Sequence, residues 1–175
     1  ASNKVICDYL VISDGVFSKG KSLISNGEIK PKYNNTIAIR GNISRNKIND
    51  LNIKNISLFM GHNFHYVIYP TNNDNETFNF IGVLKYGLAE NMLDNYSFFK
   101  EENFIQEVKD KLQNKISPTI LHNLENIKYF PIFVSESFFK PDNNIFLVGD
   151  AFFAFPPSFA QGASQSIEGS NELFN

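Results

Sequence analysis

The sequence predicts an α/β fold in which parts of a three-layer, Rossmann-like domain flank an inserted, mainly antiparallel α+β domain. Three observations support this prediction. A short apolar run stopped by an Asp-Gly or Gly-Asp pair lies near each end of the chain, at Asp14-Gly15 and Gly149-Asp150. Each pair is followed by a helical pattern, as in parallel α/β sheets. The long segment between them is rich in strand patterns, which indicates an insertion.

The C-terminal run has the order of parts that suits a cofactor-binding turn. Ile145 to Val148 is apolar and ends at Gly149, which predicts a strand covered on both faces. Asp150 then stands at the carboxyl end of that strand, where open α/β sheets bind ligands, and its carboxylate can accept hydrogen bonds from sugar hydroxyls. After a loop stiffened by Pro156 and Pro157, Gly162-Ala163-Ser164 begins a helix whose N-terminus favours an electron-rich ligand edge.

The N-terminal run repeats this order. Ile6 to Ile12 predicts a second inner strand, and Asp14-Gly15 predicts a turn after it. Phe17 to Ile24 predicts a helix with Ser18 near its first turn.

The middle segment predicts an antiparallel sheet with helices. The polar run 72–75 closes a hairpin, and Ser117-Pro118 starts the second helix as an N-cap followed by a first-turn proline. The predicted strands are Thr36–Ile43, Ile56–Met60, Phe64–Tyr69, Thr77–Leu84 and Ile127–Phe139, and the predicted helices are Glu101–Leu112 and Ile116–Leu124.

The C-terminal run resembles a motif of a known family. GDAFFAFPPSFAQGASQSIEG is similar to the second flavin-binding motif, GDAAHxxPPxxGQGxNxxxxD, of the single-component FAD-dependent aromatic hydroxylases and their monooxygenase relatives, which share the p-hydroxybenzoate hydroxylase fold. The residues that match the motif are Gly149, Asp150, Ala151, Pro156, Pro157, Gln161, Gly162 and Ala163. The residues that depart from it are Phe153 for His, Ala160 for Gly, Ser164 for Asn and Gly169 for Asp.

The N-terminal run resembles the same family's Asp-Gly motif, a strand ending in ADGxxSxxR. In the family this turn is associated with FAD and with the nicotinamide nucleotide. The family's basic residue is here Lys19 or Lys21, and lysine can still contact a phosphate without the bidentate geometry of arginine.

The middle segment resembles the salicylate-hydroxylase-like branch of that family. NTIAIRGNI, FHYVIYP and FNFIGVLK follow one another in the family's order, and the first places Arg40 where the branch has a strand arginine. The resemblance therefore implies FAD-binding segments at residues 1–30 and 139–175 and a substrate domain at 31–138.

The family's chemistry implies an FAD-dependent monooxygenase that hydroxylates an aromatic or quinone-precursor ring with NAD(P)H and O2. Asp150 would hold the ribityl chain, and the helix N-terminus would stabilise negative charge at the flavin N1/O2 edge. The implied cofactor-binding residues are Asp14, Gly15, Gly149, Asp150, Pro157, Gly162, Ala163 and Ser164. No acid or base is assigned to catalysis, because the flavin carries the difficult step.

Some residues have two interpretations of similar weight. Arg40 suits either an ordinary surface position or a place near the flavin ring or substrate. Phe153, Phe155 and Phe159 suit either core packing or an apolar substrate pocket.

Family members begin with a GxGxxG unit that binds the FAD pyrophosphate, and this sequence has none. We therefore expect the chain to be a piece of a larger protein, inactive in isolation, and a truncated gene product is the alternative. The alternatives are a flavin-dependent reductase or halogenase-like relative with the same fold, or a non-catalytic ligand-binding or interaction module.

Composition limits the remaining classes. A formal net charge of -2 with dispersed lysines gives no basic face for nucleic acid. The single cysteine allows no intrachain disulfide, and the three histidines show no metal-ligand spacing, so no metal site is expected. No transmembrane segment or signal peptide is visible, which predicts a cytoplasmic protein and leaves peripheral membrane contact and oligomeric state open.

Overall fold

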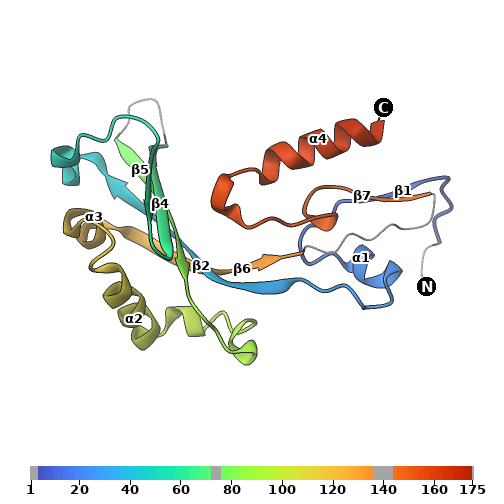
Figure 1. Cartoon of the computed structure of the whole chain (residues 1–175), viewed down its shortest axis with the longest axis horizontal. Helices are drawn as coiled ribbons and strands as arrows, with labels where there is room; N and C mark the ends of the chain where they lie inside the picture. The colour runs from blue at the N-terminus through green and yellow to red at the C-terminus, as the bar shows by residue number, and fades with distance from the viewer. Residues whose placement is uncertain (1–3, 72–75, 136–143, 175) are drawn as a thin grey trace. The chain divides into compact units, whose positions relative to one another are not determined.

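A computed structural model describes residues 4–71, 76–135 and 144–174. The chain divides into two compact units (Figure 1). Unit 1 combines Ala1–Asn34 with Phe133–Asn175, and unit 2 is the continuous segment Asn35–Ile132. The predicted boundary between residues 30 and 31 falls just before the observed one, and the boundary predicted between 138 and 139 lies outside the described residues.

Unit 2 is built on a five-stranded sheet with the order β3-β4-β5-β2-β6. Neighbouring strands from β3 to β2 pair antiparallel, with Ile39 opposite Gly82 and Ile68 opposite Phe80. The strands are β2 (Lys32–Ser44), β3 (Ser57–Gly61), β4 (Phe64–Pro70), β5 (Thr77–Lys85) and β6 (Glu125–Val134). The pairing of β4 with β5 confirms the predicted hairpin, although the turn predicted at 72–75 lies outside the described residues.

One face of this sheet carries the core of unit 2. Alternate residues of β2 point into it because side chains of a strand alternate between the two faces. Ile37, Ile39 and Ile43 are almost fully buried there. Helix α2 (Glu102–Leu112) covers them with Phe104, Val108 and Leu112, which recur every four residues as predicted, and α3 (Pro118–Asn123) adds Ile120.

Unit 1 contains a parallel pair of short strands and two helices. β1 (Leu10–Ile12) pairs with β7 (Ile145–Leu147), so that Ile12 lies opposite Leu147. Helix α1 (Lys19–Ile24) follows β1, and α4 (Gly162–Phe174) is the last element of the chain. Together with the antiparallel sheet of unit 2, this pair confirms the predicted α/β class with an α+β middle segment.

Short 3-10 helices connect several of these elements. The 3-10 helices of unit 2 are η1 (Arg45–Lys47), η2 (Asn49–Leu51), η3 (Glu90–Met92) and η4 (Phe98–Lys100). Those of unit 1 are η5 (Gly149–Ala151), before the predicted proline loop, and η6 (Pro157–Phe159), which begins at its second proline.

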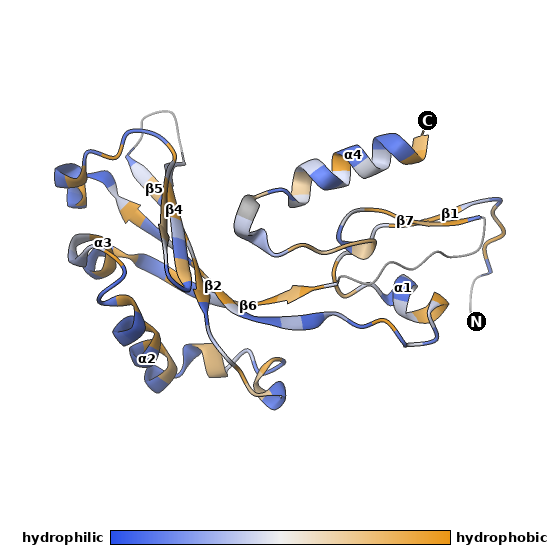
Figure 2. Cartoon of the chain, in the orientation of Figure 1, coloured by the Kyte–Doolittle hydropathy of each residue, from blue (hydrophilic) through white to orange (hydrophobic). Residues whose placement is uncertain are grey.

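The two strands of unit 1 are less buried than predicted. Leu10 and Val11 are 45% and 52% exposed, and β7 is only half-buried, whereas both strands were expected to be covered on both faces. The described sheet has two strands, so apolar residues that suit a wider sheet remain at its surface. Figure 2 shows the same strands in largely hydrophobic colours. The predicted strand Ile6–Ile12 is also shorter, because β7 offers β1 a partner for only three residues.

Candidate functional site

The two predicted turns lie at the same edge of the parallel sheet. Asp14 comes two residues after the end of β1, and Gly149 comes two residues after the end of β7. Ile12 and Leu147 are paired, so the segments that follow β1 and β7 leave the sheet from adjacent positions. The carboxyl edge of a parallel sheet is where α/β folds bind ligands, and the structure brings both motifs to it.

Asp14 stabilises the start of helix α1. Its Oδ2 accepts a hydrogen bond from the Gly20 backbone N–H at 3.0 Å. Hydrogen bonds from the Ser18 hydroxyl and, secondarily, from the Gly20 N–H hold the pKa of the Asp14 carboxyl below its ordinary value of 3.8. Gly15 has a φ of +83° and open space around it, so the backbone of this turn is accessible to a ligand.

Gly149 allows a tight turn that places Asp150 at the surface. Its φ is +60°, and a Cβ at this position would lie 3.0 Å from the Ser166 Oγ on α4. The Gly149 carbonyl accepts hydrogen bonds from the N–H groups of Phe152 and Phe153 at 2.9 and 3.0 Å, which close the turn. The Asp150 side chain is exposed and can accept hydrogen bonds from a ligand.

Helix α4 begins as predicted, at Gly162. Its first turn is closed by the Gln165 N–H, which donates to the Gln161 carbonyl at 2.9 Å. The N–H groups of Gly162, Ala163 and Ser164 precede this bond, and all three residues are exposed. The Ser164 hydroxyl donates to the Gln161 carbonyl at 3.0 Å and is thus part of the turn itself.

The loop before α4 carries the remaining predicted residues of this unit. Pro157 is exposed at the start of η6. The rings of Phe153 and Phe155 contact each other with centroids 4.5 Å apart, and Phe155 is 40% exposed. The side chain of Phe159 lies outside the described residues. These contacts leave the substrate-pocket role of the three phenylalanines a prediction.

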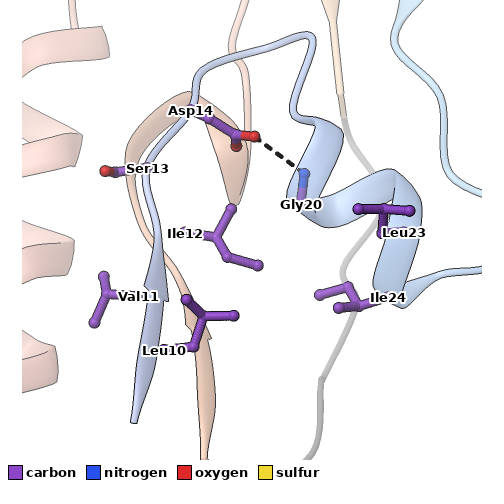
Figure 3. A pocket seen from close by; sticks show the side chains of 8 residues that line it. All are labelled: Leu10, Val11, Ile12, Ser13, Asp14, Gly20, Leu23 and Ile24. Atoms are coloured by element: carbon purple, nitrogen blue, oxygen red, sulfur yellow. Dashed lines mark hydrogen bonds between the residues drawn. The ribbon is translucent and has the colours of Figure 1, made fainter. Parts of the chain in front are cut away.

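A hollow of about 480 Å³ lies between β1 and α1 (Figure 3). Most of its lining is aliphatic, with Asp14 and Ser13 at the turn. Its lining residues are Leu10, Val11, Ile12, Ser13, Asp14, Gly20, Leu23 and Ile24. Neither Phe153 nor Phe155 is among its lining residues.

The structure separates the two lysines of the Asp-Gly motif. Lys19 is exposed, whereas Lys21 is 3% exposed and its Nζ donates to the Ser135 Oγ at 2.9 Å and the Phe152 carbonyl at 2.8 Å. The sequence predicted that either Lys19 or Lys21 contacts a phosphate, and it gave no indication of Ser135. The only available signal was the position of Lys21, three residues after Ser18, where the family motif has its arginine.

Arg40 lies in unit 2, on the sheet face opposite the core. It is exposed between the buried Ile39 and Gly41. The register of β4, β5 and β2 places Asn42, Asn79 and Tyr69 on the same face. The Asn79 amide donates to the Tyr69 hydroxyl at 2.7 Å, so this face carries a polar group beside the arginine.

These residues fit a flavin dinucleotide. The two glycine turns lie at one sheet edge, and the exposed Asp150 and the start of α4, with its first backbone N–H groups, lie in the segment that follows β7. Such groups suit phosphate oxygens, sugar hydroxyls and an electron-rich ring edge.

Metal-binding clusters and membrane-spanning helices are both absent from the described residues. Outside residues 1–3, 72–75, 136–143 and 175, no group of three or more His, Cys, Asp or Glu side chains is arranged to hold a metal ion. In the same part of the chain, every helix is too short or too polar to cross a membrane.

The chain shares its fold with FAD-dependent aromatic hydroxylases of known structure. It is similar to Klebsiella pneumoniae HpxO complexed with FAD and uric acid, with 17% identity and a TM-score of 0.66 over 92% of this chain and 40% of HpxO. It is also similar to 2,6-dihydroxypyridine-3-hydroxylase from Arthrobacter nicotinovorans, with 16% identity and a TM-score of 0.70 over 94% of this chain and 47% of that one. A salicylate hydroxylase substrate complex matches with 13% identity and a TM-score of 0.65 over 92% and 43% of the two chains.

These similarities confirm the fold that the motifs predicted. The sequence matches no known family profile and no curated protein. The chain spans less than half the length of the solved structures that it resembles.

Proposed function

We propose that this chain, which has the fold of FAD-dependent aromatic hydroxylases, supplies part of the flavin site and the substrate domain of a flavin-dependent monooxygenase. The observation that carries this proposal is the meeting of both flavin-motif turns at one edge of the β1–β7 pair. The two motifs are separated by more than a hundred residues, yet the parallel pairing brings them to adjacent strand ends.

Each residue of the turns has a role in holding FAD. The Asp150 carboxylate accepts hydrogen bonds from the ribityl hydroxyls, and the N–H groups of Gly162 and Ala163 favour negative charge at the N1/O2 edge of the flavin. Gly15 and Gly149 allow close approach of the backbone to the cofactor. Asp14 acts through the start of α1, since its carboxylate is engaged by Gly20.

The bound flavin would take a hydride from NAD(P)H and use O2 to hydroxylate an aromatic or quinone-precursor substrate. Unit 2 would bind that substrate on the sheet face opposite its core. Arg40 supplies a fixed positive charge there, and Tyr69 and Asn79 supply hydrogen-bonding groups for ring substituents. In unit 1, the contacting rings of Phe153 and Phe155 would provide an apolar surface that excludes water beside the flavin.

The proposed activity is tested on the complete natural gene product. We expect a yellow protein with bound FAD that oxidises NAD(P)H faster when an aromatic substrate is added, with uptake of O2 and a hydroxylated product. A colourless protein that binds no flavin would exclude the proposal. Hydrogen peroxide without a hydroxylated product would indicate the flavin reductase alternative.

The first prediction concerns Asp150. Asp150→Ala should weaken FAD binding by roughly 10- to 100-fold, because a charge-assisted hydrogen bond contributes about 1.5–3 kcal/mol. The affinity is measured by titrating the apoprotein with FAD and following flavin fluorescence. Glu168→Ala, which removes an exposed carboxylate from α4, is the matched control and should leave the affinity unchanged. Equal affinities of the two variants would contradict the placement of Asp150.

A further inference from the structure

Lys21 is a buried cation with no anionic partner among the residues that the structure describes. The residue is 3% exposed, and the hydrogen bonds of its ammonium go to two neutral oxygens, the Ser135 hydroxyl and the Phe152 carbonyl. Among residues 4–71, 76–135 and 144–174, no carboxylate forms an ion pair with it. Burial lowers the pKa of Lys21 from its ordinary value.

Burial of the Lys21 ammonium beside neutral acceptors is not an efficient way to stabilise the folded state. Taking an ammonium out of water is costly, and replacing buried charged groups by apolar ones of similar volume is often neutral or stabilising. An apolar side chain could fill the same space between α1 and the loop after β7. Unlike an apolar side chain, the ammonium makes directional hydrogen bonds, which fix two acceptors from two different segments relative to α1.

Two of the three segments that meet at Lys21, namely α1 and the loop after η5, adjoin the two predicted cofactor turns. Phe152 follows η5 directly and lies two residues after Asp150. Ser135 is bound to the same loop a second time, because it exchanges two backbone hydrogen bonds of 3.1 Å with Ala154. Lys21 therefore anchors α1 to the loop that carries Asp150 and to the segment that pairs with it.

The other end of this connection reaches the Asp-Gly turn. The Lys21 backbone N–H donates to the Ser18 Oγ at 2.8 Å, and the preceding Gly20 N–H donates to Asp14. A continuous path thus runs from the Asp14 carboxylate through Gly20 and Lys21 to the Phe152 carbonyl. All of its members lie in unit 1.

We propose that Lys21 is a positioning residue that holds the Asp14-Gly15 turn and the Gly149-Asp150 turn at a fixed separation, so that one dinucleotide can contact both. This inference rests on the proposed flavin function. It also assigns Lys21 a role other than phosphate binding, because its ammonium is turned to protein acceptors.

The test uses two substitutions of Lys21 and one control. Lys21→Met keeps an unbranched chain but removes both side-chain hydrogen bonds, whereas Lys21→Arg keeps the charge and the donors. Lys30→Met alters an exposed lysine of the same unit and serves as the matched control.

The first measurement needs no cofactor. Hydrogen exchange of the full-length apoprotein should speed up by about tenfold in Lys21→Met at the amides of residues 14–20 and 149–154, because two hydrogen bonds are lost. Exchange in α2 of unit 2 should stay unchanged, and Lys30→Met should match the unaltered protein. Unchanged exchange in both turns of Lys21→Met would overturn the connection itself.

The second measurement is a double-mutant cycle on FAD affinity with Asp150→Ala. We expect Lys21→Met to weaken binding by about tenfold, Lys21→Arg to restore most of it, and the double variant to bind scarcely more weakly than Asp150→Ala alone. A residue that only stabilised the fold would give losses that multiply. Multiplying losses, or unchanged affinity in Lys21→Met, would overturn the positioning role.

The two measurements separate this inference from the proposed function. If the unaltered gene product binds no FAD, the proposed function fails and the positioning role fails with it, while the exchange data still decide whether Lys21 joins the two turns. If the unaltered protein binds FAD but Lys21→Met binds it equally well, only the positioning role is overturned.

Discussion

At the scale of single residues, the Gly-Asp turn depends on the backbone freedom of Gly149. Its positive φ and the nearby Ser166 hydroxyl both disfavour a side chain at this position. Asp150 is placed outward by this turn, and Phe152 presents its carbonyl to Lys21. The identity of Gly149 therefore decides the geometry of the residues that follow it.

Gly149→Ala should lower the free energy of unfolding of unit 1 by about 1–3 kcal/mol, since a left-handed backbone is strained with a Cβ. Urea denaturation followed through hydrogen exchange of unit 1 measures this change. Gly169→Ala is the control, because Gly169 lies inside α4 with open space around it and should gain about 0.5–1 kcal/mol of helix stability. A neutral Gly149→Ala would show that the turn relaxes freely.

His65 gives unit 2 a dependence on pH. Burial lowers the pKa of His65 from its ordinary value of 6.5, so the unfolded chain takes up the proton at a higher pH than the folded one. The contribution of His65 to stability is therefore present above pH 6.5 and is lost as pH falls through the folded pKa. The urea concentration at the midpoint of unfolding of unit 2 should decrease when the pH is lowered from 8 to 5.5, and His65→Gln should make this decrease smaller. His62→Gln, at an exposed position, should leave it unchanged.

At the scale of elements, the local sequence pattern predicted a helix or strand correctly where one face of that element packs into the core. The predicted strand Thr36–Ile43 lies within β2, and the spacing of Phe104, Val108 and Leu112 on one face of Glu101–Leu112 predicted α2. β1 was predicted too long because the extent of a strand depends on its partner, and β7 pairs with only three of its residues. The buried position of Lys21 could not be predicted either, since its acceptors lie 114 and 131 positions away in sequence.

Phe104 joins helix α2 to an aromatic cluster in the core of unit 2. Its ring meets four others at centroid distances of 4.9 to 5.6 Å, and the residue is 2% exposed. The four partners are Tyr86, Phe98, Phe99 and Tyr129.

Phe104→Ala should lower the free energy of unfolding of unit 2 by about 3–5 kcal/mol, because it removes a large apolar group and leaves a cavity. Chemical denaturation of the whole chain, followed by tyrosine fluorescence, measures the loss. Tyr96→Ala, at a residue that is 69% exposed, should change the stability by less than about 0.5 kcal/mol. Similar losses in both variants would mean that α2 is not part of the core.

At the scale of the whole molecule, the two units differ in how the chain builds them. Unit 2 is one continuous segment, whereas unit 1 needs residues from both ends of the chain. The core of unit 2 lies within its own segment, which includes β3 to β5, α2 and α3. β1, by contrast, pairs only with β7 among the described strands.

A chain that ends after Ser135 should therefore lose unit 1 and keep unit 2. This truncation removes β7, η5 and α4 together with the Phe152 acceptor of Lys21. Hydrogen exchange should show β1 and α1 exchanging as in an unfolded chain, with α2 and β5 still protected as in the full-length protein. Loss of protection in α2 would show that unit 2 depends on unit 1 for its folding.

The route of the chain into and out of unit 2 has a consequence for how such proteins diversify. β2 and β6 are sheet neighbours that both cross the boundary, and the rings of Tyr33 and Phe133 lie 6.1 Å apart beside it. Because entry and exit lie side by side, the whole segment between them can be exchanged by recombination as one cassette without altering the order of the residues in unit 1. Such an exchange would keep the residues of unit 1 and replace those of unit 2 in a single genetic event.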